Sequence, residues 1–360
     1  MTTTGQEATE TFAYLDHNIL DMMTKGDPKQ IKELLKNAKL IPIFSNESLK
    51  EIHRSKGYEH TFLDLLEEIE ARFIEPTLDQ DSKSTGQAQI YTVCPKLMYE
   101  QFLQNEHENQ KNKLEFSDVL LKFYGGKTDL SFTEVFENQI DSVQKNLLAA
   151  IDGIKDIPKE MKPFIDMFQT VVEELPVEWK EKTAEMTNKL DNMDDSPITS
   201  FEAHTGVGAA TLKNINPPHV VQQVWSFISD KIGSDAFELE TFFGIKPQPY
   251  DPEPDRERTL QEKVNAIYQQ LNFLGYYRDS NMKVERRFKA SFSDMTHAGV
   301  AAFCHVFICR DGDLVMKTKA AYEYLGINTV VLFYPSEKQK GSVMLSQLKK
   351  FRNLNQKSEE

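Results

Sequence analysis

The stretch Phe12-Ala-Tyr-Leu-Asp-His-Asn-Ile-Leu20 decides the fold, because a short apolar run ends in one acid, Asp16, and a second apolar run follows. The first run, 12–15, predicts a buried strand, and the amphipathic segment 29–38 predicts a helix that returns the chain. Further strand-like segments lie at 40–44, 72–75, 89–94, 303–308 and 328–333, and the polar stretch 79–88 is expected to be a loop. Strands that alternate with helices predict an α/β fold, a three-layer α/β/α core with a mostly parallel sheet.

Three more acids stand in comparable places, each beside an apolar run. They are Glu51 in Ile43-Phe-Ser-Asn-Glu-Ser-Leu-Lys-Glu51, Asp294 in Ser293-Asp-Met-Thr-His-Ala298 and Asp311 in Val306-Phe-Ile-Cys-Arg-Asp311. Ligands of parallel α/β sheets bind at the carboxyl ends of the strands, so we expect the four acids to converge in one crevice. Clustered carboxylates bind hard divalent cations, here Mg²⁺ or Mn²⁺, and should have raised pKa values in their absence. Phosphodiester hydrolysis is a chemistry that such a centre serves.

Each acid also has a plainer interpretation. Asp16 and Asp294 are of a type that caps helices, and the sequence Asp-Gly-Asp around Asp311 is also a common turn. Glu47 lies one turn before Glu51 on the same helix face, where the helix dipole alone favours an acid; we prefer Glu51 for the site. Residues expected as additional members of the site are Glu47, Asp313, Asn18, Ser45 and His297. The histidine, like His17, is equally compatible with an ordinary polar role.

Composition limits the partners that the protein can have. The 360 residues include 42 basic and 56 acidic side chains, a formal net charge of -14, which argues against a protein-wide basic surface for nucleic acid. A local basic groove or bound metal ions would still hold a polyanion. Cys94, Cys304 and Cys309 show no CxxC spacing, which argues against zinc, and so few cysteines suit a reducing cytoplasm. The polar start and the lack of a long apolar segment predict neither a signal peptide nor a membrane partner.

The strand-like pattern is interrupted by a long helical block. We expect residues 1–94 to form the first half of an α/β domain, 95–258 a helical insertion, 259–335 the second half, and 336–360 a charged helix or tail. The insertion is expected to act as a substrate cap, a binding site for a regulatory protein, or a regulator. An oligomer is compatible with the sequence, which leaves the oligomeric state open.

Two further features point to nucleic acid. Gly206 and Gly208, in Thr205-Gly-Val-Gly-Ala-Ala-Thr-Leu-Lys-Asn-Ile215, resemble the turn of a helix-hairpin-helix module, whose backbone N–H groups contact phosphate. A glycine turn before a helix is the alternative. The densest basic patch of the chain, Arg286, Arg287 and Lys289, directly precedes Asp294 and would guide a phosphate, or else form a solvated helix face.

The four acid-bearing segments together resemble the PIN (PilT N-terminal) domain family. Tyr14-Leu-Asp-His-Asn18 is similar to its opening strand, and the segment 43–51 to its strand, serine and helical glutamate. Asp294-Met-Thr-His-Ala-Gly-Val-Ala-Ala302 and Val306-Phe-Ile-Cys-Arg-Asp-Gly-Asp-Leu314 are similar to its helix-borne aspartate and its final strand with an aspartate loop. The resemblance covers roughly residues 10–75 and 280–335. Cys309 departs from it, because the family usually has threonine or serine there.

The resemblance implies a metal-dependent nuclease in which Asp16, Glu51, Asp294 and Asp311 bind Mg²⁺ or Mn²⁺ and act on RNA more often than on DNA. A rival hypothesis is a PIN-like recognition or assembly module without catalysis, which binds protein through its helical insertion. The acidic net charge and Cys309 favour this rival, whereas the retention of all four acids favours the enzyme. A phosphatase for a small molecule would use the same metal chemistry.

Overall fold

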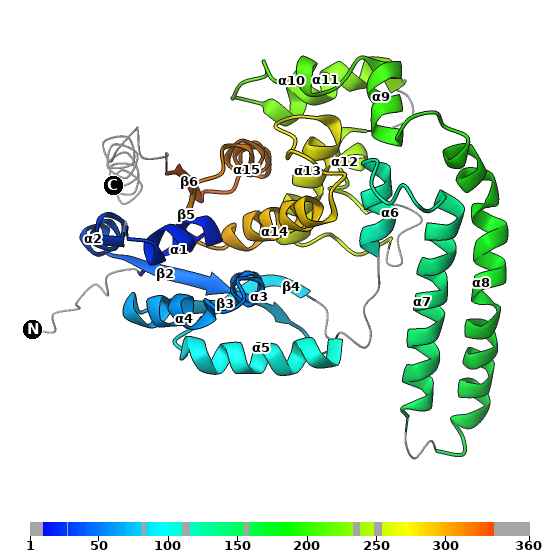
Figure 1. Ribbon diagram of the computed structural model, residues 1–360, viewed down its shortest axis with the longest axis horizontal. Coiled ribbons are helices and arrows are strands. Elements are labelled where there is room, and N and C mark those ends of the chain that lie inside the picture. Colours follow the sequence, from blue (N-terminus) through cyan, green and yellow to red (C-terminus); the bar gives the residue numbers. More distant parts are fainter. Residues whose placement is uncertain are drawn as a thin grey trace, which may run out of the picture. The chain divides into compact units, whose positions relative to one another are not determined.

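The computed structural model describes residues 10–26, 28–80, 84–109, 116–154, 158–232, 238–247 and 254–334. These residues form an α/β fold with one six-stranded sheet (Figure 1). The strands are β1 (Thr11–Leu15), β2 (Leu40–Ser45), β3 (Arg72–Leu78), β4 (Ser84–Tyr91), β5 (Val306–Cys309) and β6 (Val330–Phe333). The helices are α1 (His17–Thr24), α2 (Pro28–Ala38), α3 (Asn46–Arg54), α4 (Glu59–Glu68), α5 (Pro95–Asn109), α6 (Phe116–Phe123), α7 (Phe132–Asp152), α8 (Lys162–Asp191), α9 (Pro197–Thr205), α10 (Ala209–Leu212), α11 (Val220–Ile232), α12 (Leu239–Phe242), α13 (Leu260–Leu274), α14 (Glu285–Ala301) and α15 (Gly312–Leu325).

The order of the strands creates a switch point in the middle of the sheet. Spatially the order is β4-β3-β2-β1-β5-β6, and every neighbouring pair is parallel except β3 with β4. The chain therefore runs outward from β1 to β2 and β3, and later resumes on the other side of β1 with β5 and β6. In open parallel sheets the crevice beyond the carboxyl ends of strands at such a reversal is where ligands bind. The mostly parallel sheet predicted from the sequence is confirmed.

Side chains of the central strand alternate between the two faces of the sheet, as the period of two requires. Ala13 and Leu15 pack into an apolar core with residues of the helices α1 to α5. Tyr14 lies on the other face, where its ring contacts Phe307 of β5 and His297 of α14, with centroid distances of 5.9 Å and 5.6 Å. The residue that follows Leu15 continues this alternation, which places Asp16 on the side of Tyr14.

Strand β4 is the element that the sequence analysis missed in part. It begins at Ser84, inside the stretch 79–88 that was expected to be a loop, and ends at Tyr91 rather than at residue 94. The strand pairs antiparallel with β3 at the edge of the sheet, and most of its side chains are exposed or half-buried. An exposed edge strand needs no apolar alternation, so its polar sequence carries little strand signal.

The chain divides into two compact units. One comprises the described parts of 1–103, 207–278 and 292–360, and the other comprises 104–206 with 279–291. The sheet belongs to the first unit, whereas the second is helical and contains α7 and α8, which lie side by side (Figure 1). Of the range 95–258, expected as one insertion, the described parts of 104–206 belong to the helical unit, whereas 95–103 and the described parts of 207–258 cluster with the sheet. The expected tail 336–360 lies outside the described residues.

Within the described ranges, every helix is too short or too polar to cross a membrane.

Candidate metal centre

Asp16 stands at the switch point, directly after β1. Its backbone N–H still donates to the carbonyl of Ile308 in β5 at 3.0 Å, which fixes it between the two strands. The residue is the N-cap of α1, and both the backbone N–H and the side-chain amide of Asn18 act on its carboxylate, the amide at 3.1 Å. The carboxylate is 1% exposed. A capping role alone does not explain this burial, because charged side chains are rarely buried unless they are paired.

Glu51 and His297 meet beside Asp16. Helix α3 begins immediately after β2 and carries Glu51 on its second turn, whereas His297 comes from α14. The Nε2 atom of His297 lies 2.8 Å from Oε2 of Glu51. One turn earlier on both helices, the Ser293 hydroxyl donates to Glu47. Glu47 and Glu51 are four residues apart on α3, and their partners Ser293 and His297 are four residues apart on α14. Each pair of residues therefore lies on one face of its helix.

Three side chains form a group that can hold a metal ion. One ligand atom each from Asp16, Glu51 and His297 lies within 4.8 Å of the others. His17 borders the group, with Nδ1 4.0 Å from Oε2 of Glu51; this buried nitrogen has no hydrogen-bond partner among the residues described. Among the residues that the structure describes, the group does not include Asp294 or Asp311. The structure therefore brings two of the four predicted acids together and adds a histidine.

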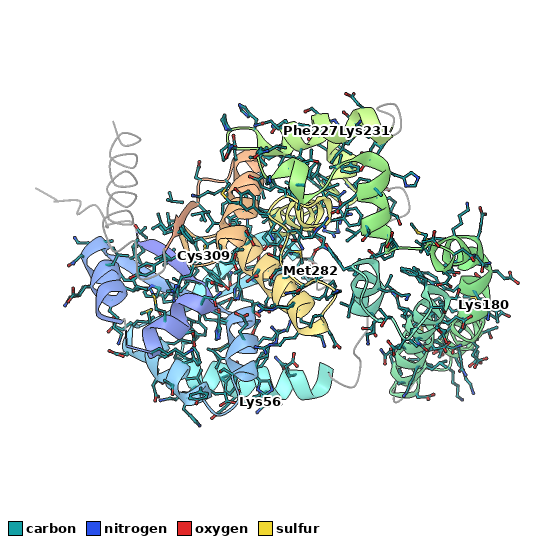
Figure 2. The ribbon with its side chains drawn as sticks, turned by 45° about the horizontal axis from the view of Figure 1, so that its top comes forward. Lys56, Lys180, Phe227, Lys231, Met282 and Cys309 are labelled. Carbon is teal, nitrogen blue, oxygen red and sulfur yellow. The ribbon has the colours of Figure 1, made fainter. Side chains whose placement is uncertain are left out.

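Asp294 and Asp311 nevertheless lie close to the same end of the sheet. Burial raises the pKa of the Cys309 thiol, and the charges of Asp16, Asp311 and Asp294 raise it further. Cys309 ends β5 and is labelled in Figure 2. Asp311 serves as the N-cap of α15, since its Oδ1 accepts from the backbone N–H groups of Asp313 and Leu314 at 2.8 Å and 3.0 Å. Asp294 lies inside α14, nine residues after its first residue Glu285, and so is not the N-cap considered from the sequence.

The ionisation of the group is unequal. Burial raises the pKa of Asp16 to about 6, with the Glu51 charge adding to the effect and His297 opposing it. Burial would also raise the pKa of Glu51, but the charge and hydrogen bond of His297, with His17 and Arg54, outweigh it and lower the pKa to about 2. The expectation of raised carboxyl pKa values thus holds for Asp16 and is wrong for Glu51, because a cation lies beside Glu51. Burial opposes protonation of His297, yet Tyr14, Glu51 and Asp16 raise its pKa well above the ordinary value.

A chain of hydroxyl groups supports His297 from the sheet. Its Nδ1 lies 2.7 Å from the hydroxyl oxygen of Tyr14, which lies 2.7 Å from Oγ of Ser45 and 3.4 Å from Oγ of Ser48. All four side chains are buried. Ser45, expected as an additional member of the site, therefore touches the group through Tyr14 rather than directly.

The residues expected to bind nucleic acid have ordinary structural roles or lie in the other unit. Gly206 ends α9 in the left-handed conformation, with φ of 67°. Gly208 precedes the short α10, whose first residue packs against Gly275: a Cβ atom at position 275 would lie 2.5 Å from the Ala209 nitrogen. The exposed patch Arg286, Arg287 and Lys289 belongs to the second unit.

Three residues at the centre were not predicted from the sequence: Tyr14, Ser293 and Arg54. Arg54, at the end of α3, donates from Nη1 to Oγ of Ser293 at 3.0 Å and is exposed. Signals for the first two were present, because Tyr14 alternates with Asp16 and Ser293 precedes His297 by one helical turn. Arg54 had no comparable signal, since an arginine at a helix C-terminus is common for reasons of the dipole alone.

Compared with known proteins, the chain matches no family model, no curated protein and no solved structure.

Proposed function

We propose that the protein is a divalent-metal-dependent nuclease and that Asp16, Glu51 and His297 hold its metal ion. The observation that carries this proposal is the convergence of their ligand atoms within 4.8 Å at the switch point of the sheet. Asp16 follows β1, Glu51 lies on α3 and His297 on α14, so the group forms only where these three parts of the first unit pack together. Carboxylates at such a point suit a ligand with phosphate groups only when a cation lies between them.

The donor set fits a metal ion of the expected kind. Two carboxylates suit Mg²⁺ and Mn²⁺, and an imidazole is more typical of transition metals, so the set favours Mn²⁺. The buried Nδ1 of His17, without a hydrogen-bond partner among the described residues, adds a polar atom at the edge of the group. The raised pKa of Asp16 agrees with a carboxyl group that needs a cation beside it to ionise fully.

The bound ion would polarise a phosphoryl oxygen and supply a hydroxide nucleophile near neutral pH. The residues of the chain would hold the ion and orient the substrate. Asp294 and Asp311 add negative charge at the same end of the sheet, which favours retention of a cation. Arg54 carries an exposed positive charge that acts on Glu51, and its guanidinium is suited to a phosphate oxygen of the substrate.

The resemblance to PIN domains supports RNA, in particular single strands, as the substrate. The PIN-like core is part of this proposal, and what supports it is the order of the four acid-bearing segments together with the parallel strands around β1. A cytoplasmic location belongs to the proposal too, on the ground that Cys94, Cys304 and Cys309 are all free thiols.

The test is cleavage of labelled single-stranded RNA, single-stranded DNA and duplexes with Mn²⁺ or Mg²⁺, beside p-nitrophenyl phosphate as a small monoester. Asp16→Asn should abolish cleavage, and Asp294→Asn should lower it less. Asp21→Asn is the matched control, because Asp21 lies on α1 and pairs with Lys25 outside the group. The proposal fails if folded native protein cleaves no polynucleotide with metal present, or if Asp16→Asn cleaves like the native chain. Hydrolysis of the monoester alone would favour a phosphatase.

A second candidate function, recognition of a protein, rests on α8 in the other unit. Phe164, Met167, Phe168 and Val171 recur at helical spacing and are between 40% and 59% exposed. Exposed apolar stripes of this kind mark interaction surfaces. The exposed neighbours of this stripe include Lys159 and Lys162 and a larger number of acids, Glu160, Asp166, Glu173, Glu174 and Glu178. This excess of negative charge favours a basic amphipathic helix as the partner.

This second function is tested with a synthetic Leu/Lys amphipathic peptide, whose binding is followed by fluorescence anisotropy. Met167→Ser should weaken binding. Phe227→Ser, which replaces an apolar side chain on α11 that is also exposed, should not (Figure 2). Equal weakening by both variants would mean that α8 has no special part.

A further inference from the structure

His297 is held at both of its ring nitrogens. Nε2 lies 2.8 Å from Glu51, and Nδ1 lies 2.7 Å from the hydroxyl oxygen of Tyr14. The imidazole is completely buried, so neither nitrogen exchanges its partner with bulk water. Whatever His297 does at the metal centre therefore depends on which nitrogen keeps a proton, and the partner at Nδ1 decides this.

The partner at Nδ1 is itself fixed by two neighbouring strands. Tyr14 comes from β1, and its hydroxyl lies 2.7 Å from Oγ of Ser45, the last residue of β2. The Tyr14 ring also contacts Phe307 of β5 at a centroid distance of 5.9 Å. The Tyr14 side chain is thus held by three adjacent parallel strands.

We propose that Tyr14 is a positioning residue: its hydroxyl oxygen accepts the Nδ1–H of His297 and donates its own proton to Ser45, which leaves Nε2 as the metal-binding nitrogen. The inference rests on the proposed function, because it assigns a role at the same metal centre. Without metal, Nε2 donates to the Glu51 carboxylate, so a bound metal ion would replace the proton on Nε2, which is released to water. The neutral imidazole then keeps its single proton at Nδ1 and offers the Nε2 lone pair to the metal. The opposite direction of the hydrogen bond to Tyr14 would keep the proton on Nε2 and remove His297 from the ligands.

This arrangement explains why a tyrosine hydroxyl is buried at the end of the sheet. Histidines that bind metals usually donate their other N–H to a fixed acceptor, which sets the ring orientation and raises the basicity of the ligand nitrogen. Loss of such an acceptor typically costs about 10-fold to 100-fold in metal affinity. We expect a loss of that size when the Tyr14 hydroxyl is removed and the ring is kept.

The experiment compares Tyr14→Phe with Tyr322→Phe. Both variants remove one buried tyrosine hydroxyl, but that of Tyr322 donates to the backbone carbonyl of Ala298 at 2.6 Å, whereas that of Tyr14 binds the imidazole of His297. The Mn²⁺ dissociation constant is measured for each by titration calorimetry. Ser45→Ala, which removes the anchor of the Tyr14 hydroxyl and not the hydroxyl itself, serves as a second variant with a smaller expected loss.

A spectroscopic measurement locates the proton of His297 in the native chain itself. The chain has 8 histidines. With these labelled with ¹⁵N, long-range ¹H–¹⁵N spectra are recorded with the diamagnetic ion Zn²⁺, and His297→Gln identifies the signal. The expected pattern is a ring protonated at Nδ1 and metal-bound at Nε2, together with a 10-fold to 100-fold weaker Mn²⁺ affinity in Tyr14→Phe and native affinity in Tyr322→Phe.

The outcomes separate the two claims. If the native chain binds neither Mn²⁺ nor Zn²⁺, the proposed function fails and the role of Tyr14 falls with it. If the native chain binds metal but the proton lies on Nε2, or Tyr14→Phe binds Mn²⁺ as tightly as the native chain, only the role of Tyr14 is overturned.

Discussion

The imidazole of His297 and the carboxylate of Glu51 lie 2.8 Å apart, although 246 residues separate them in the chain. The pair joins a helix from the beginning of the sequence to one near its end, at the point where the sheet reverses direction. It also gives Glu51 a low pKa and His297 a high one, so the two carry opposite charges over a wide range of pH. The candidate metal centre therefore contains an ion pair, with the buried Asp16 beside it.

The first prediction concerns the energy of this pair. Removal of one partner leaves the other charge buried without compensation, which costs about 3 kcal/mol or more. Glu51→Gln and His297→Gln should each destabilise the protein, and the double variant should lose less than their sum by about 1–2 kcal/mol. Urea unfolding in EDTA measures all four proteins. Strictly additive losses would mean that the pair contributes no coupling.

The second prediction concerns pH and Asp16. A carboxyl group whose pKa is raised by folding stabilises the folded state only while it is protonated. This contribution is complete below about pH 3.8, the ordinary value, and is lost as the pH rises through about 6. The shift of about two units means that ionised Asp16 costs up to about 3 kcal/mol in the metal-free protein.

Asp16→Asn should therefore be more stable than the native chain at pH 7.5 in EDTA, and the difference should shrink as the pH falls from 6 to 4. Thermal unfolding across this range checks the prediction. A variant that is less stable at pH 7.5, or a difference that does not change with pH, would show that burial does not raise the pKa of Asp16.

The third prediction separates the capping role of Asp311 from its charge. The carboxylate accepts two backbone N–H groups at the start of α15, and asparagine can do the same. Asp311→Ala should lower the free energy of unfolding by about 1 kcal/mol, whereas Asp311→Asn should lower it by only a few tenths. If Asp311→Asn keeps native stability but weakens Mn²⁺ binding, the charge serves the metal centre as well; equal losses in stability would contradict the capping role.

The fourth prediction concerns Arg54 as a contact for phosphate. Arg54→Ala should raise the KM for single-stranded RNA and reduce the slope of log affinity against log salt by about one. Lys56→Ala, which removes an exposed charge two residues further on (Figure 2), is the matched control and should leave both quantities unchanged. An unchanged salt slope in Arg54→Ala would exclude a direct phosphate contact.

Much of the fold could be predicted from the sequence because the buried strands are short apolar runs with clear ends. Asp16 was found because it terminates such a run. Glu51 was found because it lies on the helix that follows the next apolar run, on the same face as Glu47. Edge strand β4 was missed in part because its exposed residues need no apolar alternation. Local pattern thus locates elements that are buried.

The composition of the candidate metal centre was harder to predict. The sequence places Asp294 and His297 three apart on one helix, and only the packing of α14 against Tyr14 and Glu51 brings the histidine into the group instead of the aspartate. The pKa of Glu51 was misjudged for the same reason, since an unrecognised cation changes the sign of the shift. Long-range packing, which no local pattern encodes, decides both.

The most direct test of the metal centre is calorimetric titration of the metal-free protein with Mn²⁺. The account predicts saturable binding by the native chain and by Asp21→Asn, and at least about 100-fold weaker binding by Asp16→Asn and by Glu51→Gln, since these lose a ligand rather than its support. No binding by the folded native chain, or native affinity in Asp16→Asn, would contradict the assignment of Asp16, Glu51 and His297 as a metal centre.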